Sequence, residues 1–141
     1  MKTVNYFTFF LFSFLLISEV KAQNNTSIQI RISNIESSKG TILIGLYNSE
    51  SNFYKKTFRS AAVKAKKGSI QTSFEDIPAG EYGITLYHDE NDNKILDTNF
   101  LKIPKEPYGT SNNAKGNFGP PKWEDAKFSV SNTEVVQSIK L

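Results

Sequence analysis

The stretch IPAGEYGITLYHDENDNKILDTN, residues 77–99, decides the fold, because a strand pattern in it runs directly into a polar loop. Tyr82, Ile84 and Leu86 occupy every second position, and His88 continues the row. Alternation of this kind is typical of a β-strand with one buried face. We therefore expect an inward-facing row that ends at His88, whose buried imidazole would bond a loop carbonyl or a carboxylate.

Rows of the same kind recur along most of the chain. They are centred on Ile30, Ile44, Phe74, Phe128 and Ile139, and a further short strand is expected at Val63. No segment shows a sustained helical stripe. Short strands with turn signals between them predict an all-β fold, a single antiparallel β-sandwich of about seven strands, immunoglobulin-like or transthyretin-like. The side chains expected to share its core are Ile30, Ile44, Phe74, Ile84 and Phe128.

The first residues have the pattern of a secretory signal peptide, which we assign to residues 1–22. Lys2 supplies the positive start, an apolar run covers residues 7–17, and Ala22 ends the segment. The run is shorter than the ~20 residues that a transmembrane helix needs. We therefore expect cleavage after Ala22, which leaves residues 23–141 as one exported domain, periplasmic or extracellular, with no membrane anchor.

Composition narrows the classes of partner. The chain contains no cysteine, so it forms no disulfide and carries no cysteine-linked lipid. Its formal net charge is only +3, and a single short lysine-rich run lies at residues 64–67. Nucleic-acid binding draws on many basic contacts to phosphate. We therefore exclude nucleic acid as a partner, and expect an envelope protein, a glycan or a small molecule.

The segment between Asp89 and Glu124 lacks a convincing strand pattern. Loops longer than ~15 residues inside a compact domain are usually functional or disordered. This one carries the aromatic residues Tyr108, Phe118 and Trp123, and disordered segments are poor in aromatics. We predict an ordered loop laid over one end of the sandwich. Its aromatic side chains either pack the loop or, if exposed together, bind a ligand.

The beginning of this loop has the spacing of a calcium site. Oxygen-bearing side chains fall at relative positions 1, 3, 5 and 9, and a backbone carbonyl is available at position 7. Alternate Asp and Asn residues on a curling loop can converge on one hard cation. The candidate calcium ligands are Asp89, Asn91, Asn93, Ile95 and Asp97.

Two positions depart from the calcium template. Lys94 replaces the glycine of the sharp turn, and Phe100 stands where a bidentate Glu would be. The missing ligand would come from elsewhere, for example from Glu106. The alternative is a set of turns in which Asp and Asn side chains cap backbone amides without any metal.

Residues 77–99, together with IPKEPYGTSNN at residues 103–113, resemble a family of exported bacterial proteins, the domain of unknown function 2141. The matching positions are Gly80, Tyr82, His88, Asp89, Asn91, Asn93, Leu96, Asp97, Ile103, Pro104, Glu106, Tyr108, Gly109, Ser111 and Asn112. Lys94 and Pro107 depart from the pattern, since glycine is common there. The resemblance implies an exported bacterial protein, and it implies no activity.

Three functions follow from these observations. The leading hypothesis is a binding or accessory module with its site in the Asp89–Asn113 loop. The candidate binding residues are His88, Glu106, Tyr108, Ser111 and Asn112. The second hypothesis is a structural envelope protein in which the loop only closes the sandwich. The third is a hydrolase that uses His88 with Ser111 and an acid, although no nucleophile or zinc motif is present.

Overall fold

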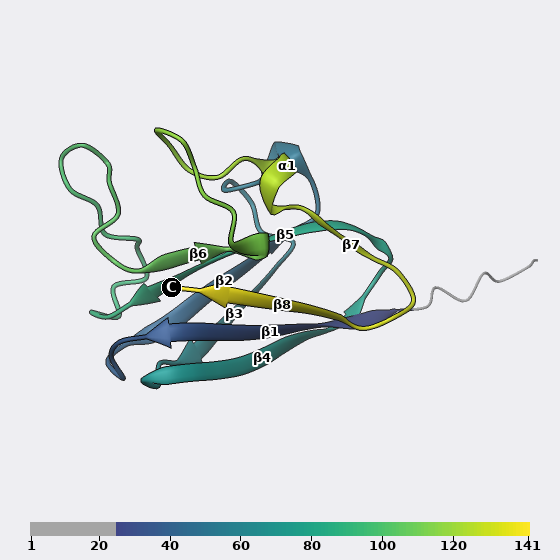
Figure 1. Cartoon of the computed structure of the whole chain (residues 1–141), viewed down its shortest axis with the longest axis horizontal. Coiled ribbons are helices and arrows are strands. Elements are labelled where there is room, and N and C mark those ends of the chain that lie inside the picture. Colours follow the sequence, from purple (N-terminus) through teal and green to yellow (C-terminus); the bar gives the residue numbers. More distant parts are fainter. Residues whose placement is uncertain (1–24) are drawn as a thin grey trace, which may run out of the picture.

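Two β-sheets packed against each other form the protein in a computed structural model that describes residues 25–141 (Figure 1). The predicted cleavage after Ala22 lies outside these residues. Among the described residues, no helix is long and apolar enough to cross a membrane.

The larger sheet has five strands. It contains β3 (Arg59–Lys64), β2 (Thr41–Tyr47), β5 (Gly80–Asp89) and β6 (Tyr108–Thr110) in that order, and β7 (Phe128–Val130) pairs with the beginning of β5. The smaller sheet has three strands in the order β4 (Gly68–Ile77), β1 (Thr26–Ile35) and β8 (Val135–Lys140). Within residues 25–141, three short helical turns complete the fold: η1 (Glu50–Asn52), η2 (Ser111–Asn113) and α1 (Trp123–Ala126).

The predicted β-sandwich and its shared core are confirmed. One buried cluster contains Ile30 and Phe74 from the smaller sheet and Ile44 and Ile84 from the larger one. Phe128 is partly buried and packs against this cluster. Alternation places these side chains between the sheets, where their removal from water stabilises the fold.

The strand pattern differs from the prediction in two respects. β8 runs parallel to β1, although every pair was expected to be antiparallel. The chain passes from β7 in the larger sheet to β8 in the smaller sheet. The parallel direction of β8 could not be predicted, because apolar alternation carries no information on strand direction. The long loop also contains the strand β6, which was not predicted because three residues including Gly109 are too few to show alternation.

Candidate functional site

The buried carboxylate of Asp89 organises the polar segment after β5. Its Oδ1 accepts a hydrogen bond from the backbone N–H of Asn93 at 3.1 Å, and its Oδ2 accepts one from Lys94 at 2.7 Å. Lys94 has a φ of 64°, in the left-handed region where non-glycine residues are uncommon. Two charge-assisted bonds to backbone amides therefore hold a tight turn at the position where the calcium template has glycine.

Two asparagine side chains continue the turn. Asn91 Oδ1 accepts from the N–H of Asn93 at 3.1 Å, and Asn93 Oδ1 accepts from the N–H of Ile95 at 2.8 Å. The two amide groups donate to the two carboxylate oxygens of Asp97 at 2.7 and 3.1 Å. The candidate calcium ligands thus gather in one turn, where hydrogen bonds within the turn engage all their side-chain oxygens.

These bonds are those of the metal-free capped turn. Within residues 25–141, no group of three or more His, Cys, Asp or Glu side chains could hold a metal ion. Calcium binding by the mixed Asp, Asn and carbonyl set stays a prediction.

Glu106 ties the two ends of this segment together. Its Oε1 accepts from the backbone N–H of Glu90 at 3.2 Å, and its Oε2 accepts from that of Asp97 at 3.0 Å. Lys105 N–H bonds the Asp97 carbonyl at 2.8 Å, which closes the base of the loop. The buried Glu106 side chain therefore faces the loop backbone.

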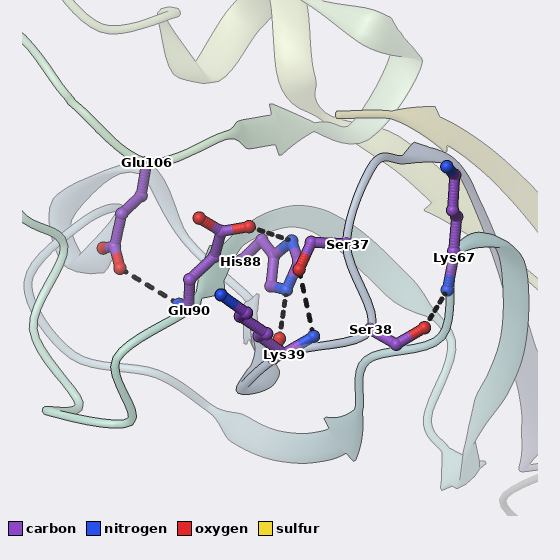
Figure 2. A network of polar contacts seen from close by, with 7 residues as sticks. All are labelled: Ser37, Ser38, Lys39, Lys67, His88, Glu90 and Glu106. Atoms are coloured by element: carbon purple, nitrogen blue, oxygen red, sulfur yellow. Dashed lines mark hydrogen bonds and ion pairs between the residues drawn. The ribbon is translucent and has the colours of Figure 1, made fainter.

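His88 lies buried at the end of β5, as its place in the row predicts. Its Nε2 donates to the carbonyl oxygen of Lys39 at 2.7 Å, and its Nδ1 lies 4.0 Å from the exposed carboxylate of Glu90 (Figure 2). Figure 2 shows Glu90 between His88 and Glu106, with its backbone directed at Glu106 and its side chain at the imidazole. The imidazole thus fastens the β1–β2 connection to β5.

Ser111 is fully buried, and its hydroxyl is occupied. It accepts from the N–H of Ile84 at 2.9 Å and donates to the carbonyl oxygen of Ala126 at 2.5 Å. Ile84 and His88 are four residues apart on β5, which corresponds to about 13 Å along a strand. The structure therefore does not bring Ser111 and His88 together as a nucleophile and its base.

Asn112 anchors the segment that precedes β7. Its side-chain amide donates to the carbonyl oxygens of Asp125 and Lys127 at 3.1 and 2.9 Å. The residue has a φ of 60°, which asparagine tolerates better than most side chains. Like Ser111, Asn112 connects the end of β6 to the α1 region.

A cavity of about 650 Å³ opens between two segments of the long loop, residues 96–104 and 118–121. Its floor is the outer face of β5 and β6, and Tyr54 contributes from the connection after η1. Both loop segments lie on the side of β6 that faces away from β8 (Figure 1). Apolar side chains that remain exposed around the opening are Tyr54, Leu101, Ile103, Tyr108 and Phe118.

The floor of the cavity is built from cross-strand pairs. Tyr87 on β5 lies opposite Tyr108 on β6, and Thr85 lies opposite Thr110. Because alternate residues share one face of a strand, both pairs point away from the core. An aromatic row and a hydroxyl row therefore run side by side beneath the loops.

An aromatic cluster fixes one wall. Phe53 lies edge-on to Tyr47 with ring centroids 5.3 Å apart, and to Trp123 at 5.4 Å. Trp123 packs on Gly83, where an added Cβ would lie 2.9 Å from the indole. The absence of a side chain at Gly83 thus lets the indole cover the strand and hold the chain that follows residues 118–121.

Tyr54 links this wall to the loop. Its hydroxyl donates to the carbonyl oxygen of Pro121 at 3.1 Å. Burial raises the pKa of Tyr54 from its usual value of 10.0 to about 12, against the opposing effect of a hydrogen bond with Thr110. The phenol therefore keeps its proton, and its hydrogen bond to Pro121, further into the alkaline range than a solvent-exposed tyrosine would.

Of the five predicted binding residues, only Tyr108 lines the cavity. His88, Glu106, Ser111 and Asn112 instead hold the elements around it. The lining residues Tyr54, Thr85, Tyr87 and Leu101 were missed. Two of them could have been found from the sequence. Thr85 and Tyr87 alternate with the inward row of β5, so the pattern places a hydroxyl group and an aromatic ring on its outward face.

Comparison with known proteins identifies the family of the chain but no chemical activity. The chain has no match among curated proteins or among solved structures. The family model described as "Uncharacterized protein conserved in bacteria (DUF2141)" matches residues 30–138. This span contains all of the turn, the cavity and both sheets except the ends of β1 and β8. The chain belongs to this family of uncharacterised bacterial proteins.

Proposed function

We propose that this protein is an exported binding module whose ligand occupies the cavity between residues 96–104 and 118–121. The observation that carries the proposal is a concave site of about 650 Å³ rimmed by exposed apolar side chains. Ligand sites in proteins have volumes of roughly 300–1,000 Å³ and are mostly apolar with a few polar groups. This cavity matches both criteria.

The supports around the cavity favour binding. One wall rests on the Tyr47–Phe53–Trp123 cluster, and the other on the turn closed by Asp89 and Glu106. A site that is ordered before its ligand arrives loses less conformational entropy on binding. The role of the polar turn in this account is to position the loop, with or without calcium at Asp89 and its neighbours.

Two alternatives are less well supported. A loop that only closed the sandwich would bury its apolar residues, whereas Leu101 and Phe118 remain exposed. A hydrolase would need His88 beside a nucleophile, whereas Ser111 bonds Ile84 and Ala126 instead. Export rests on the signal-peptide pattern of residues 1–22, and amino-terminal sequencing of envelope protein would check it.

The test uses the fluorescent apolar anion anilinonaphthalene sulfonate as a probe of the cavity. Protein expressed from the full chain should bind it saturably in the folded state, because apolar side chains surround the opening. Phe118→Ala should weaken this binding several-fold, since Phe118 lines the cavity and its ring is fully exposed. Loss of an exposed ring should leave the melting temperature unchanged.

Phe100→Ala is the matched control. Phe100 is also exposed, at the tip of the neighbouring loop, but it does not line the cavity. Its replacement should leave the affinity for the dye unchanged. Equal affinities of Phe118→Ala and wild type, or no saturable binding to folded protein, would contradict the proposed function.

A further inference from the structure

A second hollow adjoins the cavity on the outer face of the five-stranded sheet. It has a volume of about 460 Å³ and is lined by residues of β2, β3 and β5 and by Thr57. Tyr47, Thr85 and Tyr87 line both hollows. The two hollows therefore form one surface that extends from the loops to the edge strand β3.

An apolar row crosses the whole of this surface. Tyr108 on β6 lies opposite Tyr87 on β5, which lies opposite Leu43 on β2, and Leu43 in turn lies opposite Ala62 on β3. Neighbouring strands are about 4.8 Å apart, so the row spans about 14 Å. Its length suits an extended ligand better than a compact one.

A second row of small and hydroxyl-bearing residues runs beside it. Thr110 and Thr85 are followed by Gly45 on β2 and by Ser60 on β3. The hydroxyl groups can donate and accept hydrogen bonds. Gly45 carries no side chain, and the side chains of Thr57 and Tyr47 lie over its backbone, 2.9 and 3.1 Å from where a Cβ would be. The sheet thus presents one apolar track and one polar track in parallel.

The surface carries almost no charge. Among the described residues that line either hollow, Lys102 is the one with an ionised side chain. A site for a charged polymer would match each ligand charge with an opposite one. The lining is therefore complementary to an uncharged ligand.

We propose that the ligand is a neutral, linear oligosaccharide that lies across β6, β5, β2 and β3. This inference rests on the proposed function and names its ligand class. A sugar ring has an apolar C–H face and a rim of hydroxyl groups. The faces of successive rings pack on Tyr108, Tyr87 and Leu43, and their hydroxyls bond Thr85, Ser60 and the tyrosine hydroxyls.

Other ligand classes fit this surface less well. A single-stranded nucleic acid would stack on the aromatic rings, but it needs a positively charged groove along its backbone. An acyl chain would desolvate the hydroxyl of Ser60 without offering it a partner. A peptide added as a strand would pair with the backbone of an edge such as β3 rather than cover the face.

Calorimetric titration of protein expressed from the full chain tests the ligand class. The probes are neutral glucan, xylan and mannan hexasaccharides, their disaccharides, and the acidic hexagalacturonate. We expect at least one neutral hexasaccharide to bind about tenfold or more tightly than its disaccharide, since only the longer chain covers both hollows. Hexagalacturonate should bind more weakly than that hexasaccharide.

Variants at the two ends of the surface locate the ligand. Ala62→Glu should reduce the affinity for the hexasaccharide to that for the disaccharide and leave the disaccharide unaffected. Ala62 is exposed in the second hollow, so the fold should tolerate the change. Gln71→Glu adds the same charge at an exposed position of β4 in the other sheet and should change neither affinity.

Three results would overturn the inference. The first is that no neutral hexasaccharide binds, and the second is that a hexasaccharide and its disaccharide bind equally tightly. The third is that hydrophobic peptides, titrated in parallel, bind while all glycans fail. If anilinonaphthalene sulfonate still binds at Phe118 in any of these cases, the cavity stands as a binding site and only the glycan assignment fails.

Discussion

The indole of Trp123 lies directly on the backbone of Gly83, so that a Cβ at Gly83 would come within 2.9 Å of the ring. Phe53 would also lie only 3.2 Å from that Cβ. Gly83→Ala should therefore push the aromatic cluster outward and lower the free energy of unfolding by about 1–3 kcal/mol, as overpacking does. Urea denaturation measures the loss.

Trp123 is the single tryptophan of the chain, so its fluorescence reports the displacement directly. Gly119→Ala is the matched control, since nothing lies within 4 Å of a Cβ added there. A wild-type urea midpoint and an unshifted emission maximum in Gly83→Ala would show that the indole does not rest on β5.

Ser111→Ala should lower the free energy of unfolding, because the Ser111 hydroxyl bridges two buried backbone groups. The buried N–H of Ile84 and the carbonyl of Ala126 would each lose a partner at 2.9 and 2.5 Å. Unsatisfied buried groups cost about 1–3 kcal/mol. Urea denaturation should show this loss, while Ser69→Ala at an exposed position of β4 should remain close to wild type. Equal stability of the two variants would argue against the bridging role.

Asp89→Ala separates the capped turn from the calcium site. Loss of a buried carboxylate that bonds Asn93 and Lys94 should lower the free energy of unfolding by about 1.5–3 kcal/mol, the usual range for hydrogen bonds to charged groups. Because the side-chain oxygens of the turn already have partners, we expect this loss both with calcium and with chelator.

Calcium binding would produce a different pattern in the same melting curves. A ligand that binds only the folded state stabilises it by about 2.7 kcal/mol at a hundredfold excess over its dissociation constant. A calcium-dependent rise in the melting temperature that Asp89→Ala abolishes would establish the metal site. Identical curves for wild type and Asp89→Ala under both conditions would contradict both explanations.

Titration of Tyr54 should lower the stability of the fold in the alkaline pH range. Burial raises its pKa from 10.0 to about 12, so the folded state holds the phenolic proton more tightly than the unfolded state. The contribution of the Tyr54 proton to the free energy of unfolding is fully present below pH 10.0 and is lost as the pH rises through about 12. Urea midpoints should fall less steeply over this interval in Tyr54→Phe than in wild type. Parallel slopes would show that the hydroxyl is not buried against Pro121.

The strands could be predicted from the sequence because one face of each strand is buried, which places an apolar residue at every second position around Ile30, Ile44 and Ile84. The polar turn was also predicted, since the acceptors Asp89, Asn91 and Asn93 alternate within it. The direction of β8 and the existence of β6 were not, because sheet crossings and three-residue strands leave no periodic signal.

The cavity escaped prediction for a related reason. Its floor consists of outward residues such as Tyr87 and Thr85, which a search for core positions passes over. Its other parts come from Tyr54 and Phe118, which are far apart in the chain. The Trp123 cluster and the hydrogen bond from Tyr54 to Pro121 bring them together. Predicted site residues such as His88 and Ser111 carry polar chemistry, but the fold uses that chemistry to hold its elements together.

The most direct test of the central claim is a map of backbone amide chemical shifts during titration with anilinonaphthalene sulfonate. The account predicts shifts that concentrate at Thr85, Tyr87 and Tyr108 on the floor and at Leu101 and Phe118 in the loops. Shifts confined to the three-stranded sheet, or spread evenly over the surface, would contradict a ligand site between the loops.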